Sequence, residues 1–253
     1  MNIVFMGTGT SHGIPVIGCD CPVCKSTDPK NNRTRCSCLV QVSGGNLVID
    51  APPEFRVQAL RENLRRVDAV LFTHAHADHI FGLDDVRPFN ELSGKSIRCY
   101  GNTQTLAILR QTFSYVFSPT QAGGGKPRLE LVEVNGPFEA VGARIVPIPV
   151  WHGRVPVLGY RIGSFAYVTD CSRLPEESMR LLEGLHTLVL GVIRHETHET
   201  HMNVSEGLSV VERLRPGKTF FTHITHRLDH ETTNAALPDG VELAYDGLRW
   251  DVL

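Results

Sequence analysis

A dense cluster of metal-ligating side chains occupies residues 73–79, where three histidines and one aspartate follow a short apolar stretch. Neutral imidazole offers one lone pair to a metal ion, while its other nitrogen can be oriented by a neighbouring group. In an extended segment, His74 and His76 point to one side, whereas the adjacent Asp78 and His79 must point apart. This segment can therefore supply ligands to two metal ions. The alternative is a solvated polar loop, but the small alanines between the ligands leave room for a crowded site.

The His-x-His-x-Asp-His spacing after an apolar run resembles the hallmark of the metallo-β-lactamase superfamily. The resemblance covers nearly the whole chain, because four further segments match that superfamily in the same order and each follows an apolar run. These segments supply Asp50, His152, Asp170 and His223. A single histidine after a strand is more often structural, so the combination carries the resemblance.

The resemblance implies a binuclear centre that holds two divalent metal ions. One ion would be bound by His74, His76 and His152 and the other by Asp78, His79 and His223, with Asp170 as the bridging ligand and Asp50 as the residue that orients the ligands or the bridging water. Two ions about 3.5–4 Å apart can deprotonate a shared water and neutralise charge on attacking and leaving oxygens. The oxygen and nitrogen ligands tolerate Mn²⁺, Zn²⁺ or Fe²⁺.

A second cluster consists of Cys19, Cys21 and Cys24 in a C-x-C-x₂-C pattern. The chain has seven cysteines, and an odd number argues against a disulfide framework. Three closely spaced thiolates suit one structural Zn²⁺, with a fourth ligand from elsewhere to complete the tetrahedral set. We expect His226 to be this ligand, because its offset of three residues from His223 sends the two rings to opposite faces of an extended chain. Redox-active or merely buried thiols are the alternatives, and the other four cysteines are expected to be packing residues.

The thiolate motif also resembles a narrower group, the phosphodiesterases that open phosphoribosyl cyclic phosphate in bacterial phosphonate degradation. The shared segments are residues 7–9, 18–24, 222–226, 235–238 and 246–247. This resemblance implies Mn²⁺ at the binuclear centre and Zn²⁺ at the thiolates. It also implies a homodimer.

Three histidines recur within residues 195–201. The resemblance makes His201 the general acid that protonates the departing oxygen, a role that typically contributes ~10²- to 10⁴-fold to the rate. His201 lies just before an expected helix start, where Asn203 could cap the helix and help to hold the ring. Asp78 and Asp50 complete the expected catalytic groups.

Substrate contacts are harder to assign from the sequence. His198 and Arg194 are the expected substrate-binding residues, with an exposed surface loop as the alternative for His195 and His198. Arg154 and Arg173 also flank metal-bearing segments. Arginine on an exposed turn is more often solvated than bound to a ligand, so none of the three arginines is favoured strongly.

The principal hypothesis is a metal-dependent phosphodiesterase that hydrolyses a small cyclic phosphate ester, phosphoribosyl 1,2-cyclic phosphate, by attack of a metal-bridging hydroxide. Nucleases that process transfer RNA 3′ ends also resemble residues 7–11, but this chain shows no long basic insert. A non-hydrolytic relative from cofactor biosynthesis is a third hypothesis, weakened because all seven metal ligands are present. Hydrolysis of a lactam, lactone or thioester is a fourth, since the pocket walls are not visible in a sequence.

The ligands need a framework of strands that end near one another. Apolar runs predict strands at residues 2–6, 39–42, 46–50, 69–73, 97–100, 143–149, 157–162, 165–169, 187–192, 219–222, 241–244 and 248–252. Helical spacing predicts helices at residues 54–64, 103–112, 175–183, 204–214 and 232–237. Two sheets packed face to face with helices outside give one α/β domain over residues 1–253, a four-layer αββα sandwich with a zinc-binding loop at about residues 18–38. The three consecutive glycines within residues 121–126 predict a mobile loop or lid.

Composition restricts the partners. The chain has 25 Lys+Arg against 27 Asp+Glu, a net charge of −2, and no basic arm, so nucleic acid is an unlikely partner and a small anionic phosphate ester remains suitable. No apolar run approaches the ~18 residues of a membrane span. Residues 1–10 lack the pattern of a signal peptide, which leads us to expect a cytoplasmic protein without a membrane partner.

Overall fold

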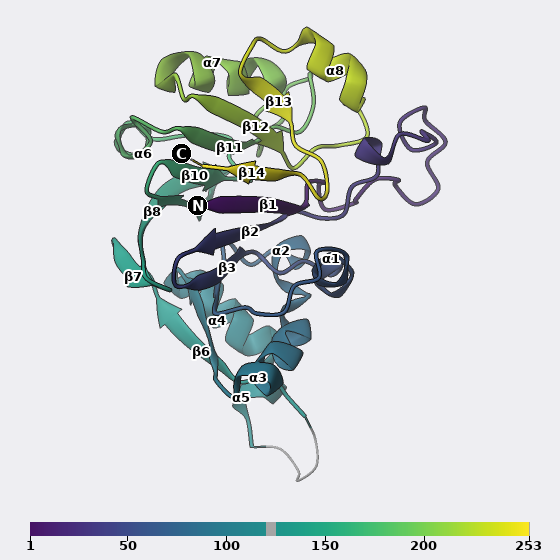
Figure 1. Cartoon of the computed structure of the whole chain (residues 1–253). Helices are drawn as coiled ribbons and strands as arrows, with labels where there is room; N and C mark the ends of the chain where they lie inside the picture. Colours follow the sequence, from purple (N-terminus) through teal and green to yellow (C-terminus); the bar gives the residue numbers. More distant parts are fainter. Residues whose placement is uncertain (120–124, 253) are drawn as a thin grey trace.

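The computed structural model describes residues 1–119 and 125–252, and within them two seven-stranded sheets pack face to face (Figure 1). One sheet has the spatial order β14 (Arg249–Asp251), β1 (Asn2–Gly7), β2 (Ser37–Val42), β3 (Gly45–Ile49), β4 (Ala69–Leu71), β5 (Ile97–Gly101) and β6 (Leu129–Glu133). The other has the order β13 (Val241–Leu243), β12 (Lys218–Thr222), β11 (Thr187–Gly191), β10 (Phe165–Val168), β9 (Val155–Ile162), β8 (Ala143–His152) and β7 (Phe138–Ala140).

Helices cover the outer face of each sheet, which gives the expected αββα layers (Figure 1). The first sheet is covered by α1 (Phe55–Arg61), α2 (Ala77–Ile80), α3 (Arg87–Ser93), α4 (Thr103–Thr112) and α5 (Ser114–Phe117). The second sheet is covered by α6 (Glu176–Leu181), α7 (Val204–Leu214) and α8 (His230–Ala236). Two short 3₁₀ helices, η1 (Pro29–Asn31) and η2 (Leu83–Val86), lie in connecting loops.

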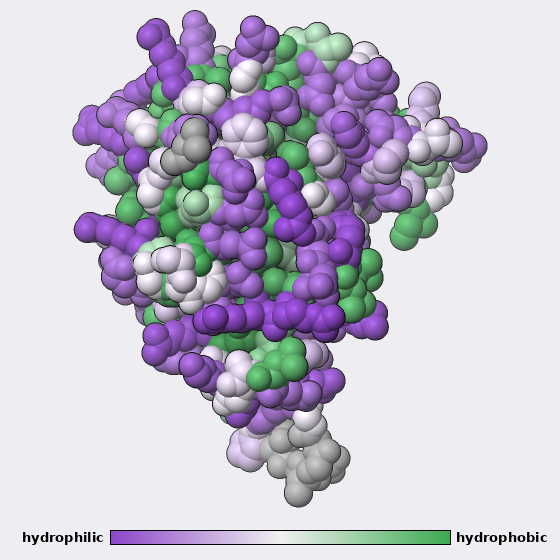
Figure 2. Space-filling view, viewed as in Figure 1, coloured by the Kyte–Doolittle hydropathy of each residue, from purple (hydrophilic) through white to green (hydrophobic). Residues whose placement is uncertain are grey.

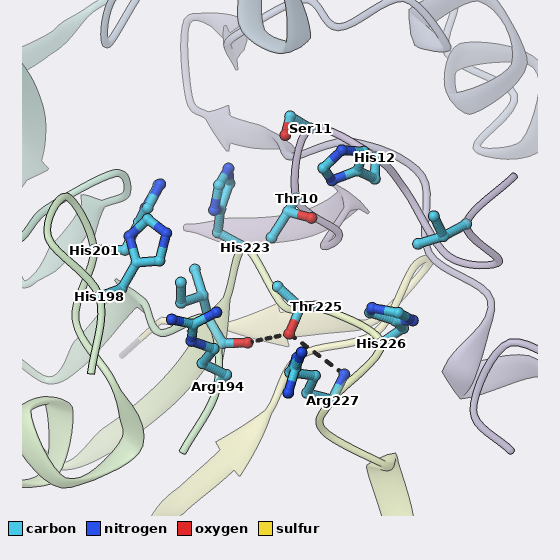
Figure 3. A pocket seen from close by; sticks show the side chains of 12 residues that line it. Thr10, Ser11, His12, Arg194, His198, His201, His223, Thr225, His226 and Arg227 are labelled. Atoms are coloured by element: carbon cyan, nitrogen blue, oxygen red, sulfur yellow. Dashed lines mark hydrogen bonds between the residues drawn. The ribbon is translucent and has the colours of Figure 1, made fainter. Parts of the chain in front are cut away.

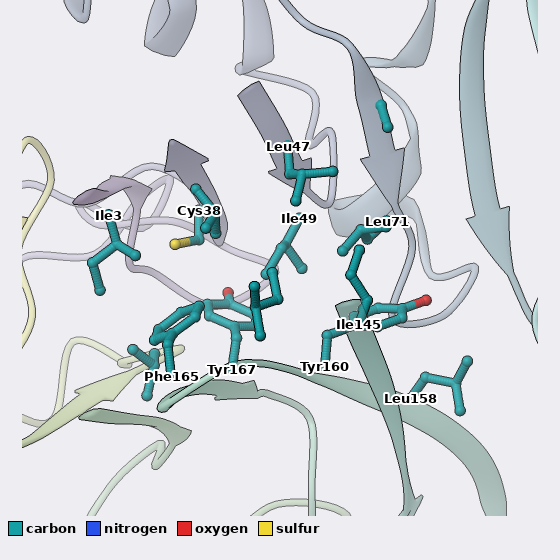
Figure 4. Close-up of a cluster of buried hydrophobic side chains, with 14 of the residues drawn as sticks. Ile3, Cys38, Leu47, Ile49, Leu71, Ile145, Leu158, Tyr160, Phe165 and Tyr167 are labelled. Carbon is teal, nitrogen blue, oxygen red and sulfur yellow. The ribbon is translucent and has the colours of Figure 1, made fainter. Parts of the chain in front are cut away.

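The period of two along each strand divides its side chains between two apolar layers. On β1, Ile3 and Phe5 pack between the sheets, whereas Val4 and Met6 pack under the helices of the outer face. Figure 4 shows the inner layer, in which side chains of both sheets, such as Ile49 and Tyr167, meet. Burial of this shared apolar surface fixes the two sheets relative to each other, and with them the strand ends that carry the polar clusters.

Parallel pairing brings the ligand-bearing strand ends together. Strands β3, β4, β5 and β6 are parallel neighbours in the first sheet. Strands β10, β11, β12 and β13 are parallel neighbours in the second sheet. Because the carboxyl ends of parallel strands meet at one edge, polar residues that follow β3 and β4 face those that follow β10 and β12.

Most of the expected elements are confirmed, with ends shifted by a few residues. The expected strands at residues 39–42 and 46–50 form the hairpin of β2 and β3, which turns at Ser43 and Gly44. The structure adds elements that the sequence analysis did not predict: β6, β7, α2, α3 and α5. These elements are short or lie at sheet edges, where the apolar pattern is weak.

The surface view is mainly hydrophilic, with apolar patches between the polar residues (Figure 2). No helix in the described part of the chain combines the length and apolarity that crossing a lipid bilayer requires. Residues 121–124 of the expected glycine-rich lid lie outside the described residues.

Candidate metal centre

The chain turns sharply at several of the strand ends that carry the histidine and carboxylate ligands. Asp50 directly follows β3, His223 directly follows β12, and one residue separates Asp170 from the end of β10. The φ angles of Asp50, Asp170 and His223 are positive, at 61°, 50° and 58°. This conformation is costly for a residue with a Cβ, of order 1–3 kcal/mol, and it persists only where the surroundings enforce it. Its recurrence at three strand ends points their side chains into one shared space.

Two groups of ligand atoms converge in this space. The groups are His74, His76 and His152, and Asp78, His79 and His223, and within each group the ligand atoms lie within 4.8 Å of one another. All six residues except His76 are buried. The sequence-predicted ligands of the two ions are therefore brought together as two adjacent sets.

Asp170 lies between the two sets. Its Oδ2 is 3.3 Å from His79 Nε2, and its Oδ1 is 3.3 Å from His223 Nε2 and 4.0 Å from His74 Nε2. Its two oxygens therefore face nitrogen ligands of both sets, the position that a bridging carboxylate requires.

Neighbouring groups orient three of the imidazoles. Thr73 donates its hydroxyl to Asp50 Oδ2 over 2.8 Å, so its oxygen accepts from His74 Nδ1 at 3.0 Å. His79 Nδ1 donates to Asp50 Oδ2 at 2.8 Å, and His152 Nδ1 donates to the backbone oxygen of Thr200 at 2.8 Å. In each ring the Nδ1 proton is thus committed, which leaves the Nε2 lone pair for a metal ion.

The donor set fits divalent metal ions. Nε2 of His79 and Nε2 of His223 are buried and have no hydrogen-bond partner among the described residues. Buried polar atoms are normally paired, so unpaired nitrogens facing carboxylates mark a place for a cation. Asp50, in contrast, is fully paired with Thr73 and His79 and acts on the ligands from behind.

Burial and neighbouring charges oppose each other in this cluster. Burial by itself would raise the pKa of Asp170, but His223 and His79 outweigh it, and the pKa of Asp170 lies well below its usual value. Burial lowers the pKa of His74 well below its usual value. Burial would lower the pKa of His79, but Asp170, Asp50 and Asp78 outweigh it and raise this pKa well above its usual value. The bridging carboxylate is therefore ionised and His74 is neutral, as metal binding needs, whereas a metal ion would displace a proton from His79.

The cysteine cluster lies in the loop between β1 and β2, where Nδ1 of His226 faces three sulfurs. The distances from this nitrogen to Sγ of Cys19, Cys21 and Cys24 are 3.2, 3.4 and 3.5 Å. A backbone hydrogen bond from Cys24 lowers the pKa of Cys21 to about 6, whereas burial raises the pKa of Cys24 to about 11. Three thiols and one imidazole in contact are a group that could hold a metal ion, and they are the donor types that tetrahedral Zn²⁺ sites use.

The other four cysteines are buried and free, as the sequence analysis expected: Cys36, Cys38, Cys99 and Cys171. Burial raises the pKa of Cys36 and of Cys171 to about 12. These thiols are therefore packing groups.

His201 reaches the metal cluster from the segment that leads into α7. Its ring centroid is 4.6 Å from that of His152, and its Nδ1 is 3.8 Å from Asp170 Oδ1. Asn203 caps α7 through a reciprocal capping box with Glu206, as expected for a residue at this position. The backbone N–H of Met202 donates to the backbone oxygen of Cys171, in the loop after β10, so His201 is held beside the bridging carboxylate.

Two observations bear on the role of His201. Burial lowers its pKa to about 3, so the ring is neutral near pH 7 in the protein alone. Its nitrogen also groups with His152 and Asp170 as a further set of close ligand atoms. A bound phosphate anion would favour the protonated ring, since an opposite charge nearby raises the pKa of an imidazole.

A pocket of about 310 Å³ opens beside His201 and His223 (Figure 3). Its wall includes His198 and Arg194, as expected, and also Arg227, which the sequence analysis missed. The further lining residues are Thr10, Ser11, His12, Val16, Ile193, Thr225 and His226. The signal for Arg227 was its place directly after the expected zinc ligand.

Two other arginines do not join this pocket. Arg154 and Arg173 are absent from its wall. The guanidinium of Arg173 instead lies 5.2 Å from the ring centroid of Trp151. Closeness in sequence to a metal-ligating residue therefore did not predict which arginines line this pocket.

Comparison with known proteins agrees with the geometry. Residues 45–224 match the model of the β-lactamase superfamily domain. The chain belongs to the metallo-β-lactamase superfamily. A crystal structure of a diphosphatase from the PhnP family is similar to this superfamily member, with 44% sequence identity, coverage of 98% of this chain and 96% of that chain, and a TM-score of 0.92.

Two further relatives have different names. Zinc-bound PqqB from Methylobacterium extorquens has a TM-score of 0.81 at 20% identity, with all of both chains covered, which shows a shared fold. An octanoyltransferase of Porphyromonas gingivalis is 33% identical over 98% of this chain but 51% of its own length, so this chain spans about half of that relative. The superfamily match and the converging ligands make this chain a metal-dependent hydrolase.

Proposed function

We propose that the protein hydrolyses a small phosphate compound whose phosphorus carries two bridging oxygens. The cyclic phosphate ester expected from the sequence, phosphoribosyl 1,2-cyclic phosphate, is one such compound, and a diphosphate is another. The observation that carries the proposal is the pocket beside the metal ligands, where Arg194, Arg227, His198 and His201 gather around one opening (Figure 3). Such a cluster suits an anionic phosphate group better than a neutral lactone or thioester.

A diphosphate is favoured by a specific finding. The protein that is 44% identical over nearly all of both chains is a diphosphatase. A diphosphate carries a second phosphate beside the scissile bond, and the pocket places two guanidinium groups there. Arg194 donates to the backbone oxygen of Thr197 at 2.7 Å and lies 3.9 Å from Glu196, which is also 3.5 Å from Arg227. Both arginines are therefore held at the opening by one loop.

The proposed ligands divide between two kinds of site. Two divalent ions, Mn²⁺ by resemblance, would each be held by one of the two ligand sets, with Asp170 shared, and would supply Lewis acidity and an acidified water. One Zn²⁺ would occupy the site of Cys19, Cys21, Cys24 and His226, where it would hold the β1–β2 loop against the segment after β12.

The residues of the chain perform the remaining tasks. Asp50 holds the His79 ring, and the backbone of Thr200 holds the His152 ring, so the ligands do not reorganise during the reaction. The arginines at the pocket opening orient the phosphate. A water oxygen bonds to phosphorus as the bridging P–O bond breaks, and His201 gives its proton to the departing oxygen.

A side-by-side assay tests the proposal. We expect the protein loaded with Mn²⁺ to hydrolyse phosphoribosyl 1,2-cyclic phosphate or a diphosphate diester at least tenfold faster than a phosphomonoester, a lactone or a thioester. A lactone or thioester as the best substrate would overturn it. Hydrolysis of a transfer RNA precursor in preference to small phosphates would move the function to the nuclease alternative.

A further inference from the structure

We infer that a second, apolar pocket beside the metal ligands holds an aromatic ring of the substrate. This ring belongs to the organic group carried by the phosphorus that water attacks. This inference rests on the proposed phosphohydrolase function and names the substrate class, an aryl- or nucleobase-bearing diphosphate. The pocket has a volume of about 140 Å³, and its wall includes His74 and His76. It shares no lining residue with the arginine-bearing pocket, which adjoins His201 and His223.

Four of the eight residues that line this pocket are aliphatic, namely Ala75, Ile108, Val155 and Pro156, and the other four are the uncharged polar residues Gln104 and Thr105 and the two histidines. Ile108 on α4 is 37% exposed, and Val155 at the start of β9 is 38% exposed. Large aliphatic side chains that stay exposed beside a polar cluster gain free energy when a ligand covers them. No lysine, arginine or carboxylate lines this pocket, so it has no charged partner for a second phosphate.

The scaffold fixes both sides of the apolar pocket. Val155 pairs directly with the ligand His152 across the β8–β9 hairpin. On the opposite wall, Asn102 caps α4 by accepting a hydrogen bond of 2.8 Å from the Thr105 backbone N–H. The β9 backbone is also bonded to the ligand segment, from Leu158 N to Thr73 O at 3.0 Å. The pocket is thus positioned by the same elements that position the metal ligands.

The contrast between the two pockets determines which phosphorus atom of a diphosphate is attacked. A diphosphate with one organic group has a charged end that suits Arg194 and Arg227, and an apolar end that suits Ile108 and Val155. Because His201 lies on the arginine side, the departing oxygen belongs to the terminal phosphate. Water therefore attacks the phosphorus that bears the organic group, its oxygen bonds to that phosphorus, and the P–O–P bridge breaks. The bridging oxygen leaves with the terminal phosphate and takes a proton.

Phenyl diphosphate and methyl diphosphate are matched probes, because they differ only in the organic group. We expect kcat/KM of the native protein to be at least tenfold higher for phenyl diphosphate. In the double variant Ile108→Ser/Val155→Ser this preference falls to twofold or less, because kcat/KM falls more for phenyl diphosphate than for methyl diphosphate. Leu181→Ser is the control, because Leu181 is also 38% exposed but lies on α6. The control keeps the preference.

Hydrolysis in ¹⁸O-labelled water tests which phosphorus atom is attacked. The label should appear in phenyl phosphate and not in orthophosphate. Label in orthophosphate would overturn the inference, and so would an equal rate for both probes or a preference that survives in the double variant.

Binding separates failure of the inference from failure of the proposed function. Phenyl phosphate should bind the native protein at least tenfold more tightly than methyl phosphate in calorimetric titrations, and the double variant should lose the difference. If no phosphate compound is hydrolysed but this difference is present, the proposed function fails and the apolar pocket stands. If phosphates are hydrolysed and the difference is absent, the pocket assignment fails alone.

Discussion

The histidine–carboxylate cluster and the cysteine cluster are built in opposite ways. The first takes its ligands from the ends of β4, β8, β10 and β12, so it draws on both sheets, and nearly all of it is buried. The second takes three ligands from six residues of one loop, and all four of its residues are partly exposed. Its fourth residue, His226, comes from the segment after β12 in the second sheet.

This difference leads us to expect catalysis from the histidine–carboxylate cluster and support of the fold from the cysteine cluster. The ligand rings of the first cluster are oriented from behind by Asp50, Thr73 and Thr200, whereas we propose that a bound ion holds the loop of the second in place. His223 and His226 lie three residues apart in one segment and point to the two clusters. Loss of an ion from the first cluster should therefore abolish the reaction, and loss from the second should mainly loosen the fold.

The largest effect is expected from Asp170→Asn. The amide cannot provide two anionic oxygens to both ligand sets, so kcat should fall by at least ~10³-fold, the scale found when one member of a concerted catalytic group is removed. Metal analysis should show loss of catalytic ions with the zinc retained. Asp251→Asn, at the exposed edge of β14, is the control and should behave like the native protein.

Replacement of His201 should have an effect that depends on the leaving group. His201→Ala should slow a substrate with a poor, alkoxide-like leaving group by ~10²-fold or more, and an activated aryl diester by less than tenfold, because only the poor leaving group needs the proton. Equal losses on both substrates would remove the general-acid role. His195→Ala, in the same loop but exposed, should leave both rates unchanged.

Asp50→Asn tests the support behind the ligands. The His79 ring would lose its charged hydrogen-bond partner, and we expect metal affinity to fall by ~10- to 100-fold. At saturating metal the activity should largely return. A variant that is inactive even when fully loaded would place Asp50 in the reaction itself.

The smallest effect on catalysis is expected from Cys21→Ser. The folded yield and zinc content should fall, while the rate per folded molecule stays within about twofold of the native rate. A stable, correctly folded variant without activity would contradict the separation of the two clusters. Cys99→Ala is the control, because Cys99 lies in the core and outside the cysteine cluster, and this variant should keep the native zinc content.

The sequence predicted which polar residues would gather, because each of their segments lies at the end of an apolar strand. This pattern can be recognised in the sequence without knowledge of tertiary contacts. The structure brings the predicted residues together at the facing strand ends. The edge strand β6 was missed because its residues, Leu129–Glu133, are only half-buried and carry two glutamates. Arg227 was missed because its role depends on where the loop of Glu196 lies, which is set by contacts remote in sequence.

The account depends on divalent ions at the histidine–carboxylate cluster, and titration after chelation tests this most directly. The metal-free protein should have no measurable phosphohydrolase activity, and activity should return in proportion to the occupancy of two divalent ions per chain, apart from the zinc at the thiolates. A chelated protein that contains no divalent ion in this cluster and still works at its native rate would contradict the account.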